Sequence, residues 1–154
     1  MTIEIKDAAA LEGMRLAGRL TAEVLDYLTP FVQPGITTNE LDRLAEEYTT
    51  QVLHAISAPL NYDPSGRNPY PKSICTSINH QVCHGIPNDK PLKKGDIVNI
   101  DVTVIKDGWH GDSSRMYQVG ETSIAAKYEH RRLLSPIRFS VGAHLARVSS
   151  RSYN

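Results

Sequence analysis

The feature that most constrains the fold of this chain is a β-hairpin signal around Asp107-Gly108. The residues before it, 97–105, are rich in Val, Ile and Thr, a composition typical of a β-strand. Asp-Gly favours the two-residue turn that joins antiparallel strands, so we predict a return strand from Trp109 to about Val119. A two-residue turn places Lys106 opposite Trp109 and thereby fixes the register of the whole hairpin.

This register brings two carboxylates to one face of the predicted hairpin. Along the first strand, apolar residues alternate with a polar row that includes Asp101 and Thr103, so the two sets point to opposite faces. Thr103 lies opposite Asp112 in this register, which makes Asp101 and Asp112 diagonal neighbours about 7 Å apart at Cβ. The two carboxylates are expected to repel each other. Either this face is simply exposed to water, or it binds a divalent cation, for which paired carboxylates are suitable ligands.

Two helices are predicted ahead of the hairpin. From Asp7 to about Val32, apolar residues recur every three or four positions, with Asp7 placed to cap the start and Pro30 expected to weaken the last turn. A second helix, over residues 37–52, opens with the Thr-x-x-Glu spacing of a capping box.

The segment between the helices and the hairpin is predicted to be a loop followed by two short strands. Residues 59–71 contain four prolines and one glycine, which favours a loop. Residues 74–80 are predicted to form a short strand, and residues 81–84 its return partner, which a Gly-Ile-Pro turn ends. Helices followed by an antiparallel sheet indicate an α+β fold.

Composition narrows the class of protein. The chain has 154 residues, enough for one domain, and 17 basic side chains balance 17 acidic ones, so nucleic acid and anionic membranes are not its expected partners. We find neither an apolar run of membrane-spanning length nor the basic and apolar start of a signal peptide. Two cysteines, Cys75 and Cys83, do not make a disulfide framework. The expectation is a cytoplasmic, single-domain protein.

The charge balance changes abruptly near residue 128. Residues 1–127 contain 12 basic and 16 acidic side chains, whereas residues 128–154 contain five arginines, no lysine and one acid. The tail could be a basic arm for nucleic acid or a solvated, disordered extension. We favour a third interpretation, in which residues 128–154 are an aberrant, out-of-frame segment that does not belong to the preceding domain.

Two histidines are candidates for a functional site. His80 and His84 are four residues apart, a spacing that on a helix resembles half of a zinc site. The surrounding sequence, which continues into Gly-Ile-Pro, is not helical, so we set a zinc-protease site aside. A lone imidazole beside such a turn can point into a cleft. His84 is therefore a candidate site residue, and an ordinary surface or core histidine is the alternative.

Several motifs in this order and spacing resemble the type I methionine aminopeptidases. The first runs from Tyr70 to Asn79 and continues with Val-Cys-His-Gly-Ile-Pro at residues 82–87. The second comprises residues 95–103 and 107–115, which form the predicted hairpin. The match covers residues 1 to about 127. It implies the N-terminal half of the pita-bread fold, in which two pseudo-symmetric α+β halves enclose a dinuclear metal centre.

The resemblance also implies roles for individual residues. Asp101 and Asp112 correspond to metal ligands, the first chelating and the second bridging, and His84 corresponds to a histidine that contacts the substrate and assists catalysis. Tyr62 and Tyr70 match positions at the methionine pocket. The implied cofactors of the complete enzyme are two divalent metal ions, drawn from Co, Mn, Fe, Zn and Ni.

The implied activity is the removal of N-terminal methionine from nascent proteins when the next residue is small. The implied partners are the N-termini of new polypeptides, at the ribosome, and the family enzyme is a cytoplasmic monomer. Family members are much longer, and their second half supplies a histidine and two glutamates as further ligands, together with the general base. We therefore expect residues 1–127 to be the N-terminal part of an aminopeptidase domain in a truncated, inactive chain. A non-catalytic pita-bread module that binds peptides or a partner is the alternative.

Overall fold

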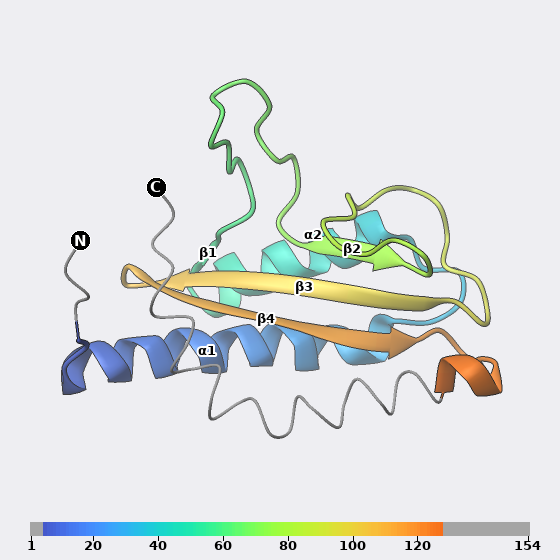
Figure 1. Cartoon of the computed structure of the whole chain (residues 1–154), viewed down its shortest axis with the longest axis horizontal. Helices are drawn as coiled ribbons and strands as arrows, with labels where there is room; N and C mark the ends of the chain where they lie inside the picture. Colours follow the sequence, from blue (N-terminus) through green and yellow to red (C-terminus); the bar gives the residue numbers. More distant parts are fainter. Residues whose placement is uncertain (1–4, 128–154) are drawn as a thin grey trace.

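The computed structural model describes residues 5–127 of the chain (Figure 1). Two helices come first, α1 (Ala8–Leu28) and α2 (Thr38–Glu47). Four strands of a single sheet follow, and they are β1 (Ile56–Ser57), β2 (Cys75–Ile78), β3 (Ile97–Lys106) and β4 (Trp109–Gln118). This order confirms the predicted α+β class, with helices before an antiparallel sheet.

Helix α1 has the predicted start and a modified end. The side chain of Asp7 accepts a hydrogen bond from the backbone N–H of Ala10 at 2.8 Å, which satisfies a donor that the first turn leaves unpaired. The α-helix ends at Leu28, and a 3₁₀ turn follows over Thr29–Phe31. Pro30 lies inside that turn and has no N–H to donate. The α-helix therefore ends before Val32, which was its predicted end.

Helix α2 is shorter than predicted, because its last five predicted residues form a π-helical turn, Tyr48–Val52. The Thr37 hydroxyl caps the helix by accepting the N–H of Glu40 at 3.1 Å. At the other end, the Thr50 hydroxyl donates to the carbonyl of Glu46 at 2.7 Å. A side-chain donor that occupies a carbonyl of the preceding turn competes with the α-helical backbone bond, which fits the wider turn seen here.

Strand β3 is the centre of the sheet. It pairs with β4 on one side over ten residue pairs, from Ile97 opposite Gln118 to Lys106 opposite Trp109. On its other side, β1 and β2 pair with opposite ends of β3. The turn residues Asp107 and Gly108 both have positive φ, 51° and 82°, as a type I′ turn requires. The predicted hairpin register is therefore confirmed.

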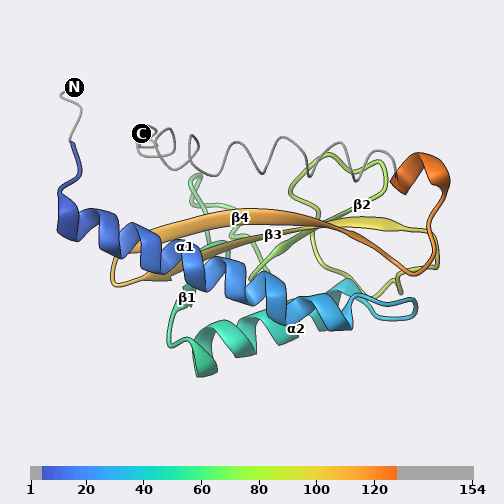
Figure 2. The ribbon, with the colours of Figure 1, turned by 90° about the horizontal axis from the view of Figure 1, so that it is seen from below.

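Both helices cover the same face of the sheet (Figure 2). The alternating apolar residues of β3 are buried on this face among core residues from α1 and α2, and they are Val98, Ile100, Val102 and Val104. The polar row of β3, with Asn99, Asp101 and Thr103, lies on the opposite face, which we call the carboxylate face. This separation follows from the two-residue side-chain period of a strand.

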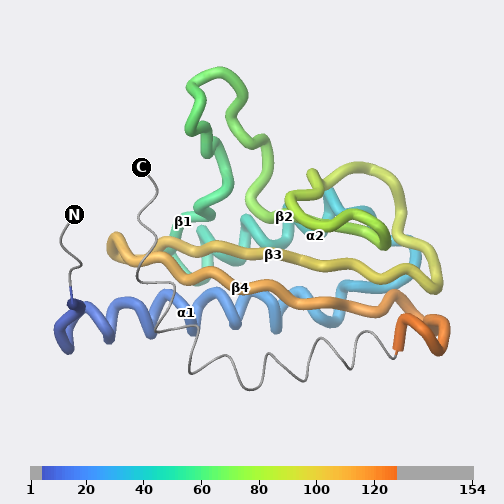
Figure 3. The backbone as a smooth tube through the Cα atoms, viewed as in Figure 1, coloured from blue at the N-terminus to red at the C-terminus, as the bar shows by residue number. Residues whose placement is uncertain are grey.

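The segments that connect the helices to the hairpin differ from the prediction in two places. Residues 59–71 form no strand or helix, as predicted, and the loop between β1 and β2 projects away from the sheet (Figure 3). The predicted return strand over residues 81–84 is wrong. Asn79 has φ 53° and His84 has φ 55°, so the backbone turns at both ends of this segment, and Gly85 contacts β2 instead. The two-residue strand β1 was not predicted.

None of the helices within residues 5–127 combines the length and apolar character needed to cross a lipid bilayer. The interpretation of residues 128–154 as an aberrant tail concerns residues outside the described range, so it stays a prediction.

Candidate active site

The hairpin brings Asp101 of β3 and Asp112 of β4 together on the carboxylate face. Asp101 pairs with Ser114, and Thr103 pairs with Asp112, so the two carboxylates are diagonal neighbours as predicted. The Thr103 hydroxyl donates to Oδ1 of Asp112 at 2.9 Å, which orients that carboxylate on the sheet. Asp112 is exposed, whereas Asp101 is half-buried.

The electrostatics of this pair match the repulsion expected from the sequence. Burial, and then the negative charge of Asp112, raise the pKa of Asp101 to about 6. The charge of His84 acts in the opposite direction, which shows that the imidazole lies within electrostatic range of Asp101. A bound cation would relieve both causes of the raised pKa, since it would replace lost solvation and offset the repulsion.

His84 lies in an exposed loop that Gly85 fixes against strand β2. The carbonyl of Gly85 accepts the N–H of Thr76 at 2.7 Å, and the N–H of Gly85 donates to the Ser77 hydroxyl at 3.1 Å. A Cβ atom at position 85 would lie only 2.0 Å from the carbonyl oxygen of Thr76, so the loop can come this close only with glycine. The sequence Gly-Ile-Pro after His84 thus holds the histidine beside the sheet.

Tyr70 lies beside the same loop, because its hydroxyl reaches the Gly85 carbonyl. Its hydroxyl is within hydrogen-bond distance of two backbone carbonyls, those of Ile74 at 3.1 Å and Gly85 at 3.2 Å. Burial, followed by its hydrogen bond with Cys75, raises the pKa of Tyr70 well above its ordinary value, and the charge of Asp101 adds to the shift. The phenol is therefore protonated and lies near the carboxylates.

Tyr62 is placed differently from Tyr70. Its backbone carbonyl accepts the N–H of Tyr70 at 2.9 Å, so the two residues are neighbours across the loop. The side chain of Tyr62 is 56% exposed. Within residues 5–127, the hydrogen bonds of Tyr62 join its backbone to Pro59 and Tyr70, and its side chain makes none with Asp101 or Asp112. Its assignment to a methionine pocket remains a prediction.

Cys75 belongs to this group of residues and was missed as a site residue. It lies directly opposite Asp101 in the pairing of β2 with β3, so its side chain shares the carboxylate face. Burial raises the pKa of its thiol, and the charges of Asp101 and Asp112 raise it further. The sequence predicted a strand here but not the pairing of that strand with β3, and this pairing is the information that identifies Cys75.

The donor set suits part of a divalent metal site. Carboxylate oxygens are ligands for hard and borderline cations, and Asp101 and Asp112 offer them from one face. Among residues 5–127, no group of three or more His, Cys, Asp or Glu side chains is arranged to hold a metal ion. The described residues therefore offer two carboxylate ligands, with His84 and Tyr70 close by.

Comparison with known proteins assigns this arrangement to a family. The model of metallopeptidase family M24 matches residues 12–138. The chain is 59% identical over 127 residues to a methionine aminopeptidase from Rickettsia prowazekii, which covers 82% of this chain and 47% of that protein. It is 57% identical over 125 residues to the Escherichia coli methionine aminopeptidase, covering 80% of this chain and 46% of that one. The chain thus spans about half the length of these relatives.

Solved structures give the same result for the fold. The crystal structure of methionine aminopeptidase from Rickettsia prowazekii superimposes with a TM-score of 0.77 at 57% identity, over 82% of this chain and 49% of that one. An X-Pro aminopeptidase from Thermotoga maritima, at 22% identity and a TM-score of 0.66, shares the fold. The described residues form the N-terminal half of a pita-bread fold. Sequence, hairpin geometry and fold together show that the chain belongs to metallopeptidase family M24.

Proposed function

We propose that this chain carries the N-terminal half of the active site of a methionine aminopeptidase. The proposed reaction is the metal-dependent removal of N-terminal methionine from nascent proteins whose next residue is small. The observation that carries the proposal is the placement of Asp101 and Asp112 as diagonal neighbours on one face, with burial and mutual repulsion raising the pKa of Asp101. The identity to methionine aminopeptidases supports the choice within the family.

In this proposal Asp101 and Asp112 would supply carboxylate ligands to the divalent metal ions of the complete site. When bound, such ions would lower the pKa of a water molecule and polarise the scissile carbonyl. The Thr103 hydroxyl keeps the Asp112 carboxylate oriented. With a pKa of about 6, Asp101 is mainly ionised at neutral pH and is able to bind a cation.

His84, Tyr70 and Tyr62 are proposed to bind the substrate. His84 and Tyr70 lie on the two segments that meet at Gly85, and Asp101 interacts electrostatically with both. Either imidazole nitrogen, when protonated, can donate a hydrogen bond to a carbonyl oxygen of the peptide. The proposed substrate partners are the N-termini of new polypeptides, at the ribosome, in the cytoplasm, and the proposed state is a monomer.

The remaining ligands and the general base are proposed to lie outside residues 5–127, in sequence that corresponds to the second half of the relatives. This follows from the two carboxylates that the described residues provide and from the half-length match. The non-catalytic peptide-binding alternative is less favoured, because a module of that kind does not need paired carboxylates at the cost of their repulsion.

Calorimetric titration with Mn²⁺ tests the proposal. The chain should bind Mn²⁺ weakly, and Asp101→Asn and Asp112→Asn should each reduce that binding further. Asp107→Asn is the matched control, because this exposed carboxylate belongs to the same hairpin but lies in its turn. Mn²⁺ binding that survives in the double variant Asp101→Asn, Asp112→Asn would place the metal elsewhere and would contradict the proposal.

A further inference from the structure

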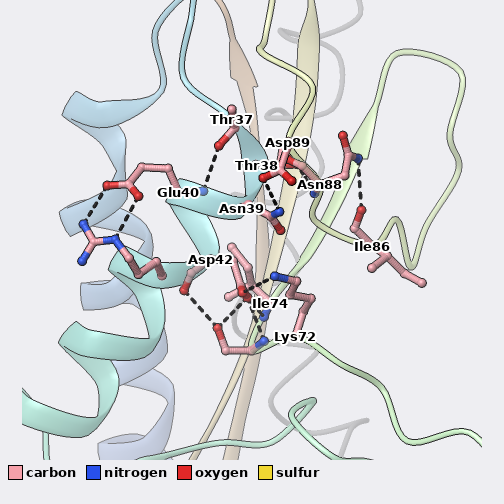
Figure 4. A network of polar contacts seen from close by, with 12 residues as sticks. Thr37, Thr38, Asn39, Glu40, Asp42, Lys72, Ile74, Ile86, Asn88 and Asp89 are labelled. Carbon is pink, nitrogen blue, oxygen red and sulfur yellow. Dashed lines mark hydrogen bonds and ion pairs between the residues drawn. The ribbon is translucent and has the colours of Figure 1, made fainter.

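Helix α2 contacts both chain segments that carry the proposed substrate-binding residues (Figure 4). Its first turn contacts Asn88 and Asp89, which follow the His84 loop, and its middle contacts residues 72–74, which follow Tyr70. These contacts come from the side of α2 that faces the sheet, whereas Arg43 on the exposed side pairs with Glu40 and Glu47 of the same helix.

Asp42 anchors the segment before β2. It is 8% exposed, and its Oδ1 atom accepts hydrogen bonds from the N–H of Ser73 at 2.8 Å, the hydroxyl of Ser73 at 2.7 Å and the N–H of Ile74 at 3.2 Å. Lys72 Nζ lies 3.5 Å from Oδ2. A carboxylate at this depth is costly unless such donors surround it, so these contacts fix the position of the segment.

Thr38 anchors the segment after the His84 loop. Its buried hydroxyl accepts the N–H of Asn88 at 2.8 Å and donates to the carbonyl of Asn88 at 3.2 Å. The backbone N–H of Asn39 donates to that same carbonyl at 3.0 Å. One hydroxyl thus satisfies both backbone groups of a single loop residue, three residues after Gly85.

The two anchored segments meet again at Tyr70. The single proton of its hydroxyl is shared between the carbonyls of Ile74 and Gly85. Asp42 accepts the N–H of Ile74, and Gly85 lies in the segment that Thr38 holds. The hydrogen bonds therefore form a closed loop of contacts, which we call the circuit. It runs from α2 through Ile74, Tyr70 and Gly85 to Asn88 and back to α2.

We propose that Asp42 and Thr38 are positioning residues, which set the separation of Tyr70 and His84 through this circuit. The meaning of that separation rests on the proposed function, whereas the circuit itself can be tested without metal or peptide. Within residues 5–127, no hydrogen bond or ion pair joins either residue to Asp101 or Asp112, so both act through Tyr70 and the His84 loop.

The first test compares Thr38→Val, which removes the hydroxyl but keeps the shape, with Thr38→Ser, which keeps the hydroxyl. Amide hydrogen exchange of Thr76, whose N–H bonds to Gly85, should accelerate about tenfold in Thr38→Val, as expected for losing a buried hydrogen-bonding group. The NMR signals of the His84 ring should shift in the same variant. Thr38→Ser should restore both, and Arg43→Ala, on the exposed side of α2, should change neither.

The second test uses Asp42→Ala and Asp42→Asn. The alanine variant should accelerate exchange of the Ile74 amide and raise the alkylation rate of half-buried Cys75 relative to exposed Cys83. Asp42→Asn retains the Oδ1 acceptor and should lie closer to the parent chain. In every variant the amides of β3 and β4 report whether the sheet is intact.

Three results would overturn the proposal. The first is unchanged Thr76 exchange and an unchanged His84 spectrum in Thr38→Val with an intact sheet. The second is an effect of Thr38→Ser as large as that of Thr38→Val. The third, which applies if Thr38→Val does not fold, is an Asp42→Asn chain whose Cys75 is as reactive as that of Asp42→Ala. All three measurements are made on the metal-free chain, so they do not depend on the outcome of the Mn²⁺ titration.

Discussion

Asp101 has a pKa that makes the stability of the chain depend on pH. Its folded-state pKa of about 6 lies above its ordinary value, so the folded chain binds this proton more tightly than the unfolded chain does. The cost of ionising Asp101 in the folded state is therefore absent below about pH 4. It grows as the pH rises from about 4 to about 6 and is complete above that range.

We predict that Asp101→Asn changes the stability of the metal-free chain only where Asp101 is ionised. Below about pH 4 the variant and the parent should unfold at similar urea concentrations. Above about pH 7 the variant should be more stable by about 1–2 kcal/mol, because it lacks the partly desolvated charge and its repulsion with Asp112. Urea unfolding in dilute solution with a chelator, from pH 4 to pH 7.5, measures this, and Asp107→Asn is the control. A stability difference that does not vary with pH would contradict the prediction.

At the scale of single residues, the sequence predicted those site residues whose positions follow from local structure. Asp101 and Asp112 were placed by the alternation of a strand and by a two-residue turn. Cys75 and Asp42 were missed because each depends on a contact between distant segments, one across β2 and β3 and the other between α2 and the start of β2. Such contacts leave no periodic signal in the sequence.

At the scale of elements, α1 and β4 approach each other unusually closely at Gly111. A Cβ atom at this position would lie 2.2 Å from the carbonyl oxygen of Ala17 in α1. The buried hydroxyl of Thr21 also donates to the carbonyl of Gly111 at 2.8 Å. Strand β4, which carries Asp112, is therefore held directly against the helix backbone at the neighbouring residue.

We predict opposite effects from two glycine-to-alanine substitutions in this region. Gly111→Ala forces α1 away from β4 and should lower the free energy of unfolding by about 1–3 kcal/mol. Gly18→Ala lies in the interior of α1 with no atom within 4 Å of the added Cβ, so it should raise stability by about 0.5–1 kcal/mol. Urea unfolding of both variants measures the difference. Equal effects of the two substitutions would show that the close contact at Gly111 is not maintained in solution.

The elements that the sequence predicted well are those whose ends are set by neighbouring residues in the chain. The hairpin was predicted in full because a two-residue turn fixes its register. The segment over residues 81–84 was predicted to be a strand and is a loop, because Gly85 and Asn88 bind β2 and α2 and so determine its shape. Strand β1 has two residues, too few for any alternation to be seen.

At the scale of the whole molecule, we predict that the isolated 154-residue chain has no appreciable aminopeptidase activity. The two aspartates and the histidine that residues 5–127 bring together do not supply the ligands of a dinuclear centre or its general base. Hydrolysis of a Met-Ala-Ser peptide with added cobalt or manganese measures this. Turnover similar to that of a full-length relative, and lost in Asp112→Ala, would show that other residues of the chain or a second chain complete the site.

A second prediction at this scale concerns the outer edge of β4. Among residues 5–127, only β3 pairs with this strand, so alternate residues along its outer edge have backbone groups with no partner strand. We expect the chain to self-associate and to bind an apolar dye as its concentration rises. Met116→Lys, which adds a charge at this edge, should reduce the association in light scattering or sedimentation. A parent chain that stays monomeric and unfolds in one sharp transition would contradict this prediction.

The two-residue turn at Asp107 and Gly108 has a consequence for evolution. The turn is exposed, and a Cβ atom at Gly108 would meet no atom within 4 Å. Exposed, uncrowded turns usually accept insertions. One added residue here would shift β4 by one position against β3 and rotate every side chain of β4 to the other face. Asp112 would then face the helices, and Arg115 would leave its ion pair with Asp26 for the carboxylate face. Among related proteins, the number of residues in this turn should therefore vary less than the identity of those residues.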